Sequence, residues 1–460
     1  MKIIQKYTLT TLSVIARNPT FVSSFATKPL LPALTTTTTT SSHLPFFHRS
    51  FALSMTQRKS SSTSNKATRA CPSVPTHLKG VFCGSGSDAM NDTRITNAIL
   101  NLVNKPPQET NVLYLGTATY DIEGFFIRQT QRFVEAGCHV EALKVAGVDT
   151  TSADEQWLSS LSPQERIRYY EEKIDNADVL VVGGGNTLFA LDRWRKLGLV
   201  PALRRAGERG AVLTGGSAGA ICWFDGGHSN SADPSTYKSI RVKKFANRSP
   251  DEIVDEIYSY KSDSSTDADS DSDDEDTDAD MSSSDEEMSD SDDEGESKNN
   301  NKKTSKPWEY FRVSALGFFP GLVSPHLDRV QSNGVLRARD FDECLLQHPG
   351  ENGIGIDHFA ALIVDGPNFE VLSLTDKEGT VKKVDDNTFE FVEDGSGDPG
   401  VWIKQAVNGK VVSRVCPPRG QLKDILRVAS TIVEDEEATR QCRMANPDDG
   451  WVPPTPAIRQ

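Results

Sequence analysis

Cysteine is scarce in this sequence, and the few cysteines present have no metal-binding or redox spacing. Seven are scattered over 460 residues, and no two of them form a C-x-x-C pair. This distribution excludes a disulfide scaffold and a cysteine-rich zinc site. The eight histidines are equally dispersed and contain no HExxH motif, so the sequence calls for no metal and we expect no cofactor. The cysteines are Cys71, Cys83, Cys138, Cys222, Cys344, Cys416 and Cys442.

Long apolar runs are missing, and charges of one sign are missing from two segments. No apolar run reaches 18 residues, which argues against a membrane span. Residues 1–87 hold ten Lys and Arg but no acid, whereas residues 262–297 hold 18 Asp and Glu but no Lys or Arg. The rest of the chain carries only −7 of the overall −15. We expect no nucleic-acid partner, because the only basic excess lies in a Ser/Thr-rich first segment.

That first segment, residues 1–75, resembles a targeting sequence. It is rich in Ser, Thr and basic residues and includes a run of six threonines at residues 35–40. Its first 17 residues can form a short basic amphipathic helix, and polar residues interrupt the apolar stretch that a secretory signal would need. These features are typical of an organellar transit peptide. We predict a mitochondrial location, with plastid and cytoplasm as the alternatives.

From residue 76 onward, short apolar runs alternate with amphipathic segments. The runs GVFC, NVLYL, HVEAL, DVLVV and AVLT indicate strands, and segments with helical periodicity follow them. Strands that alternate with helices of about 10–15 residues predict a parallel sheet. The fold class is therefore α/β, a mostly parallel sheet flanked by helices. A pair of strands around Asp365 and Gly366 should extend the sheet, and residues 420–442 are predicted to form a late helix.

A highly acidic segment interrupts this pattern. Residues 259–306 are dominated by Asp, Glu, Ser, Asn and Lys and offer no apolar face, so we expect a disordered insertion. Because apolar patterning resumes beyond it, residues 76–258 and 307–392 are predicted to form one discontinuous domain. Residues 393–460 would be a C-terminal extension with a strand and a helix.

The sharpest functional motif is Gly215-Gly216-Ser217-Ala218-Gly219. It fits the G-x-S-x-G pattern, with an apolar strand before it and a predicted helix after it. A serine on such a turn presents its hydroxyl at the carboxyl edge of the sheet, and the small neighbours let a substrate approach. The alternative is a tight turn with an incidental serine, or a phosphate-binding loop.

A second glycine loop follows another predicted strand and has the sequence Gly183-Gly184-Gly185-Asn186-Thr187. It does not match G-x-G-x-x-G and it lacks a P-loop lysine. A glycine N–H beside Ser217 would instead form an oxyanion hole together with the N–H of Ala218.

A histidine is the expected base. His326 in SPHLD follows an apolar strand and a proline, so it should lie at a strand end. His228 competes because it is close to Ser217 in sequence, whereas His348 and His358 are weaker candidates.

Three motifs, LVVGGGNTLFAL, GGSAGAICWF and SPHLD, together resemble the aspartyl dipeptidase (dipeptidase E) family of serine peptidases, relatives of cyanophycinase. The resemblance covers residues 77–251 and 308–374. It implies a class I glutamine-amidotransferase-like fold and a metal-independent peptidase that removes N-terminal Asp from short peptides. By motif, Ser217 is the nucleophile, His326 is the general base, and the N–H groups of Gly185 and Ala218 form the oxyanion hole.

The third triad member is less clear from the resemblance. Asp233 has the family's spacing from the serine, and we predict it as the acid. Asp328, two residues after His326, is the alternative. Asp225 is closer in sequence to Ser217 and its helix, and it is expected to point away from the site.

Other functions stay open at this point. A cyanophycinase-like hydrolase or a general esterase would use the same serine. A non-catalytic amidotransferase-like scaffold would use the acidic segment to recruit basic partners. For the peptidase we expect short peptide substrates and no membrane partner, and a homo-oligomer stays open.

Overall fold

Two mixed β-sheets with helices packed against them make up the part of the chain that the structure describes. This computed structural model describes residues 74–147, 157–158, 160–245, 248–259, 307–385 and 388–448. All of them belong to one unit, Thr68–Gln460. The predicted targeting sequence up to residue 73 and the acidic tract at 262–297 lie outside the described residues, as do residues 449–460.

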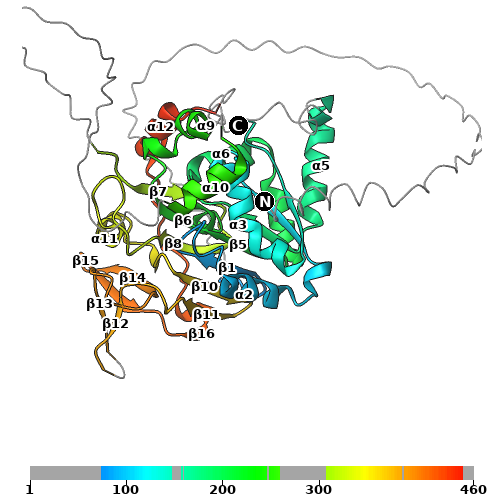
Figure 1. Ribbon diagram of the computed structural model, residues 1–460. Coiled ribbons are helices and arrows are strands. Elements are labelled where there is room, and N and C mark those ends of the chain that lie inside the picture. The colour runs from blue at the N-terminus through cyan, green and yellow to red at the C-terminus, as the bar shows by residue number, and fades with distance from the viewer. Residues whose placement is uncertain are drawn as a thin grey trace, which may run out of the picture. The chain divides into compact units, whose positions relative to one another are not determined.

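The first sheet has eight strands in the order β16-β11-β10-β1-β5-β4-β2-β3. Strands β1, β5, β4, β2 and β3 are parallel, and β10, β11 and β16 add antiparallel strands beyond β1. Figure 1 shows the blue β1 close to the yellow-brown β10 and the green β5. The five predicted strands and the predicted hairpin are confirmed. The strands are β1 Lys79–Cys83, β2 Asn111–Leu115, β3 His139–Ala142, β4 Val179–Val182, β5 Val212–Gly216, β10 Ala360–Asp365, β11 Asn368–Ser373 and β16 Arg419–Gln421.

Helices cover both faces of this sheet, as the α/β prediction requires. Successive strand residues point to opposite faces, so Val81 packs with residues of α2 and α3, whereas Phe82 packs with residues of α5, α6 and α7. Local signals set the helix ends: Ser162 and Glu165 form a capping box at α5, and Gly210 ends α7 in the left-handed conformation. The helices are α2 Thr93–Val103, α3 Glu123–Ala136, α5 Pro163–Asp175, α6 Thr187–Lys196 and α7 Val200–Arg209.

The second sheet was not predicted. Its six strands have the order β15-β14-β9-β8-β6-β7, with β6, β8 and β9 parallel. The helix expected over AGAICWF is only the short α8, Ala218–Ile221, and β6 begins three residues later. Phe82 of the first sheet packs edge-on against Phe224 and Phe319 of the second, with ring centroids 5.0 and 5.1 Å apart. The strands are β6 Phe224–Ser229, β7 Phe311–Ser314, β8 Phe319–Pro325, β9 Asn352–Ile356, β14 Val401–Val407 and β15 Lys410–Val415.

The C-terminal residues complete both sheets. Strand β14 pairs with β9, and β16 pairs with β11. The helix predicted over residues 420–442 is wrong, because β16, a 3₁₀ turn and a stretch without regular structure come before a shorter helix, α12 Glu436–Ala445. Leu422, Ile425 and Leu426 are buried at a spacing that imitates a helix, but the Leu422 N–H donates to the Pro367 carbonyl oxygen.

The remaining elements lie at the periphery of these sheets or close to the undescribed segments. No helix of the described residues is long and apolar enough to cross a membrane. The elements are α9 Lys238–Phe245, α10 Pro250–Ser259, α11 Arg337–Gln347, β12 Val381–Lys383 and β13 Phe389–Phe391.

Candidate active site

Ser217 occupies a strained turn between β5 and α8. Its backbone angles are φ 55° and ψ −125°, a conformation that residues other than glycine rarely adopt. Such a residue costs about 1–3 kcal/mol and persists only where its surroundings hold it. The Ser217 N–H donates to the Cys83 carbonyl oxygen at 3.2 Å. A Cβ atom at Gly216 would lie 1.9 Å from the Ser85 carbonyl oxygen, and one at Gly219 would lie 2.1 Å from that of Val182. The small residues of the motif are therefore required by close backbone approach.

The second glycine loop lies directly against Ser217. A Cβ atom at Gly184 would be 3.3 Å from the Cβ of Ser217. Gly185 has φ +129°, and a Cβ atom there would meet the Ala118 carbonyl oxygen at 2.2 Å. Buried Asn186 caps α6 through the Phe189 N–H and donates to the Ser231 carbonyl oxygen, which fixes the loop. The first turn of α8 has no intrahelical acceptor for the Ala218 N–H. Gly184, which precedes Gly185, thus lies beside the serine, and Ala218 follows the serine in sequence. The oxyanion-hole role of the Gly185 and Ala218 N–H groups stays a prediction.

His326 begins the turn that follows β8 and also has a positive φ, 54°. Its N–H donates to the Gly84 carbonyl oxygen at 3.2 Å. The neighbouring carbonyl, that of Cys83, binds the N–H of Ser217. Two consecutive peptide groups at the end of β1 therefore hold the predicted nucleophile and the predicted base at the same edge of the sheet. Residues far apart in sequence are brought together here.

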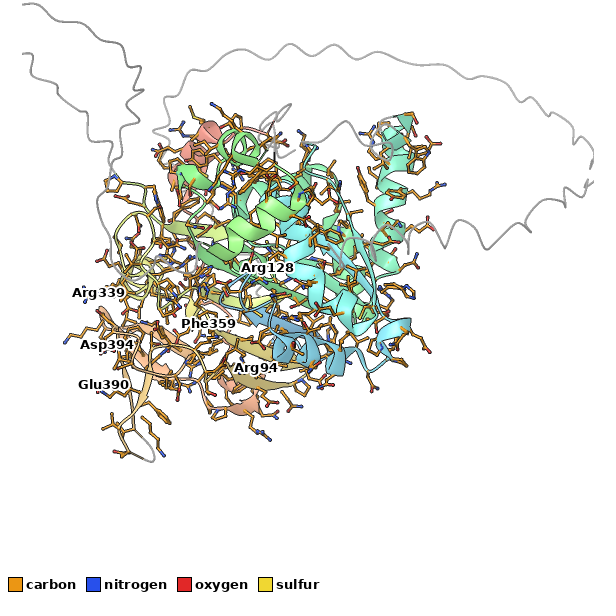
Figure 2. All side chains as sticks on the ribbon, viewed as in Figure 1. Arg94, Arg128, Arg339, Phe359, Glu390 and Asp394 are labelled. Atoms are coloured by element: carbon orange, nitrogen blue, oxygen red, sulfur yellow. The ribbon has the colours of Figure 1, made fainter. Side chains whose placement is uncertain are left out.

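The side chain of His326 belongs to a hydrogen-bonded chain. Its Nδ1 lies 2.8 Å from the Nδ1 of His358, and the Nε2 of His358 lies 2.8 Å from Asp88 Oδ2. The Arg128 guanidinium is 3.8 Å from the other oxygen of Asp88. Figure 2 shows Arg128 and Phe359, the residue after His358, toward the middle of the ribbon, whereas Arg339, Glu390 and Asp394 lie near its left edge.

The surroundings keep the His326 imidazole neutral. Burial lowers the pKa of His326 well below its usual value of 6.5, and the positive charges of Arg337 and Arg329 and the neighbouring His358 ring act in the same direction. A neutral imidazole has an unprotonated nitrogen that can accept a proton, which is the form that the predicted general base requires.

The two carboxylates considered for the triad have other partners. Asp233 caps the 3₁₀ turn Pro234–Thr236, since its Oδ1 accepts from the Ser235 N–H at 2.9 Å. Its Oδ2 accepts from the Ser332 hydroxyl at 3.1 Å. Asp328 Oδ1 accepts from the backbone N–H of His358 at 2.7 Å. The role predicted for Asp233 stays a prediction, and neither carboxylate occupies the Nδ1 of His326.

The competing histidine, His228, is buried inside the second sheet. Its Nδ1 lies 3.2 Å from the Ser324 hydroxyl, and its Nε2 lies 2.7 Å from Asp340 Oδ1. The ring stacks on Tyr310. Burial lowers the pKa of His228 to about 4. Both ring nitrogens are engaged, which is the environment of a structural histidine.

The sequence did not reveal the contacts of His358 with His326 and Asp88. Asp88 follows β1, and His358 follows β9, which runs parallel to β8 with Pro325 opposite Ile356. Residues that follow parallel neighbouring strands meet at one edge, so the pairing of β8 with β9 would have revealed the contact. Within the described ranges, no group of three or more His, Cys, Asp or Glu is arranged to hold a metal ion.

Comparison with known proteins confirms the resemblance inferred from the three motifs. Residues 81–247 match peptidase family S51, a stretch that includes Ser217 and ends before His326. The chain is 30% identical over 159 residues to the uncharacterized peptidase YgaJ of Bacillus subtilis (strain 168), which covers 34% of this chain and 60% of that protein. These matches support a serine peptidase.

Two other similarities carry no functional argument. The chain is 26% identical over 381 residues to a Trypanosoma brucei brucei protein named G2/mitotic-specific cyclin-1, covering 80% of this chain and 94% of that protein. A crystal structure of a peptidase from an acI-B1 actinobacterium is 14% identical with a TM-score of 0.40, covering 75% of this chain and 98% of that one.

Proposed function

Because residues 81–247 match peptidase family S51, we propose that this protein is a serine peptidase that hydrolyses short peptides, with dipeptides bearing N-terminal Asp as the preferred substrates. One observation carries the proposal most strongly. Ser217, in a strained turn, and neutral His326 are held by the consecutive carbonyls of Cys83 and Gly84. A nucleophile beside an unprotonated base is the arrangement that acyl transfer requires.

The reaction would proceed through an acyl-enzyme. His326 Nε2 takes the proton of the Ser217 hydroxyl while the oxygen attacks the peptide carbonyl carbon. The N–H groups of Gly185 and Ala218 bind the negatively charged oxygen of the tetrahedral intermediate. His326 then protonates the leaving amine, the C–N bond breaks, and a water molecule activated by the same histidine hydrolyses the ester.

Arg329 is proposed to recognise an acidic substrate side chain. It lies three residues after His326, its side chain is 29% exposed, and its charge lowers the pKa of His326. The Nε of Arg329 lies 3.4 Å from Asp328 Oδ2, and its guanidinium carbon lies 5.6 Å from the centroid of the Phe359 ring. The side chain is therefore held in position but is still accessible. A partly exposed guanidinium close to the base suits a carboxylate.

A dipeptide screen tests this function. We would compare Asp-Xaa with Asn-Xaa, isoaspartyl and β-Asp-Arg substrates, using the wild type and Arg329→Gln. Asp-Xaa is expected to be the best substrate, and Arg329→Gln should raise KM for Asp-Xaa about 10-fold or more while leaving Asn-Xaa nearly unchanged, the effect of losing one charge-assisted contact. Equal turnover of Asp-Xaa and Asn-Xaa by the wild type would refute the specificity. Preference for β-Asp-Arg would favour a cyanophycinase-like hydrolase.

A further inference from the structure

We propose that His358, backed by Asp88, orients His326 in place of the acidic residue that usually fills this position, so that the site contains a Ser–His–His–Asp chain. The proposal rests on the proposed function, because it gives His326 the role of base. His358 and Asp88 are positioning residues here, since they act on the substrate only through His326.

The contact between the two rings fixes which nitrogens carry protons. A distance of 2.8 Å between the Nδ1 atoms of His326 and His358 requires one donor and one acceptor. The Asp88 carboxylate, 2.8 Å from His358 Nε2, can only accept a hydrogen bond, so Nε2 carries a proton and donates. His358 in its neutral form then has an unprotonated Nδ1, which accepts the N–H of His326 Nδ1. This leaves the Nε2 of His326 unprotonated, as a general base requires.

The opposite assignment would abolish the base. If His358 were doubly protonated, its Nδ1–H would donate to His326, and the single proton of neutral His326 would lie on Nε2. The proximity of a second charge on His358 would also oppose the formation of imidazolium at His326. The chain ending at the Asp88 carboxylate therefore selects the tautomer of His326 by way of the tautomer of His358.

Several contacts hold the His358 ring in position. The His358 N–H donates to Asp328 Oδ1 at 2.7 Å, which connects the turn after β9 to the turn after β8. The Phe359 ring lies edge-on to the imidazole with a centroid distance of 4.6 Å. His358 and Asp88 are 15% and 17% exposed, so water reaches their edge only in part. A ring restrained on both sides can transmit orientation to its neighbour.

Charged groups from every neighbouring element bear on this chain. Among the described residues, Asp88 is a carboxylate in direct contact with an imidazole of this hydrogen-bonded chain. The groups are Arg329 and Arg337 near His326, Asp328 at the His358 backbone with Asp357 beside it, and Arg128 near Asp88.

The His358 ring between Asp88 and His326 determines how much kcat should fall when either Asp88 or His358 is replaced. In a direct His–Asp pair, replacing the acid by its amide costs about 10⁴-fold in kcat, because the histidine takes the wrong tautomer. Here a neutral ring separates the carboxylate from the base, and an Asn oxygen at position 88 can still accept from His358. We expect Asp88→Asn to lower kcat about 10- to 100-fold, and His358→Ala about 100- to 1000-fold, with KM little changed.

Asp340 provides a matched control for the Asp88→Asn variant. Asp340 accepts from His228 Nε2 at 2.7 Å, almost the same contact as that of Asp88 with His358, but it lies on α11 and its histidine partner belongs to β6 of the second sheet. The rate of Ser217 labelling by a fluorophosphonate and kcat on a dipeptide would be measured for Asp88→Asn and Asp340→Asn, together with their Tm. Only Asp88→Asn should slow both rates.

Chemical rescue separates positioning from a general structural role. Added imidazole should restore part of the activity of His358→Ala, because it can donate to Asp88 and accept from His326. 1-Methylimidazole should not, because it has no N–H for Asp88. Rescue by both compounds would refute the proposed Ser–His–His–Asp chain. Rescue by neither compound, in a variant that keeps its Tm and has low activity, would also refute it.

A readout that does not depend on activity keeps the two proposals distinguishable. Nitrogen NMR of the full chain with ¹⁵N-labelled histidine, assigned with His326→Gln and His358→Gln, should show His326 protonated on Nδ1 and His358 on Nε2. Other tautomers would overturn the chain even in an active enzyme. If the expected tautomers appear but the wild type neither labels at Ser217 nor cleaves peptides, the peptidase proposal fails. If the wild type labels at Ser217 and cleaves peptides, but Asp88→Asn and His358→Ala are as active as the wild type, only the proposed Ser–His–His–Asp chain is refuted.

Discussion

Gly184→Ala separates the space beside the nucleophile from the stability of the fold. The new Cβ would lie 3.3 Å from the Ser217 Cβ, 3.4 Å from the Gly216 carbonyl oxygen and 3.6 Å from the Gly86 Cα. These contacts are tight but can be relieved by shifts of a few tenths of an ångström. Gly184 is not among the glycines with positive φ, so alanine fits its backbone conformation. We expect the free energy of unfolding to change by no more than about 1 kcal/mol, since mild overpacking is partly offset by a less flexible unfolded chain.

Activity should respond much more strongly than stability. The methyl group would lie beside Ser217, where the proposed reaction requires the substrate carbonyl to enter. A displacement of the reacting groups by about 1 Å costs on the order of 100-fold in rate, so we expect kcat/KM to fall about 10- to 100-fold. Denaturant unfolding and dipeptide kinetics on the same preparation measure both quantities.

Gly185→Ala is the control for this reasoning. Its Cβ would lie 2.2 Å from the Ala118 carbonyl oxygen at φ +129°, so this variant should lose stability by several kcal/mol. If Gly184→Ala kept full activity, the glycine loop would not border the reacting groups. If Gly184→Ala unfolded as readily as Gly185→Ala, the packing argument would be wrong.

Two further predictions concern pH and charge. Because the pKa of His326 is lowered, the base stays unprotonated in more acidic solution, and the acid limb of kcat/KM should lie below pH 6.5; a limb at or above 6.5 would contradict the environment described for His326. Replacing residues 262–297, with their 18 acids, by a short Gly/Ser linker should leave Tm and kcat on neutral dipeptides nearly unchanged. It should also raise kcat/KM for acidic relative to basic peptides at low salt only, whereas a collapse of Tm would show that the segment belongs to the fold.

The first sheet could be predicted because its strands carry their signal locally. Val179–Val182, for example, is an unbroken apolar run followed by three glycines, and such a run between helical segments is typical of a buried parallel strand. The second sheet could not be predicted in the same way. Its strands β6 and β9 have the sequences FDGGHS and NGIGI, in which glycines remove both apolar periodicity and β propensity. They pair with strands that are distant in sequence, β6 with β7 and β8, and β9 with β8 and β14.

The candidate site also combines residues that lie in local motifs with contacts that depend on the pairing of distant strands. Ser217 and the glycine loop lie within short motifs whose turn geometry depends on adjacent residues, so the sequence was enough to predict that both loops are tight turns. The partner of His326 depends on β8 lying beside β9 in one particular register, which no local pattern reveals. Asp233 has the family's spacing from the serine, and the structure adds that its side chain caps a turn, which spacing alone does not reveal.

Labelling with a fluorophosphonate tests the central claim, that Ser217 is a nucleophile activated by His326, most directly. The full chain would be treated with the probe, digested and analysed by mass spectrometry, alongside Ser217→Ala and His326→Gln with their Tm values. The account predicts one label, on the peptide that contains Ser217. It also predicts no label in Ser217→Ala and labelling slowed by roughly 10³-fold or more in His326→Gln, with Tm preserved. Labelling on a different residue, or an unchanged rate in His326→Gln, would contradict the account.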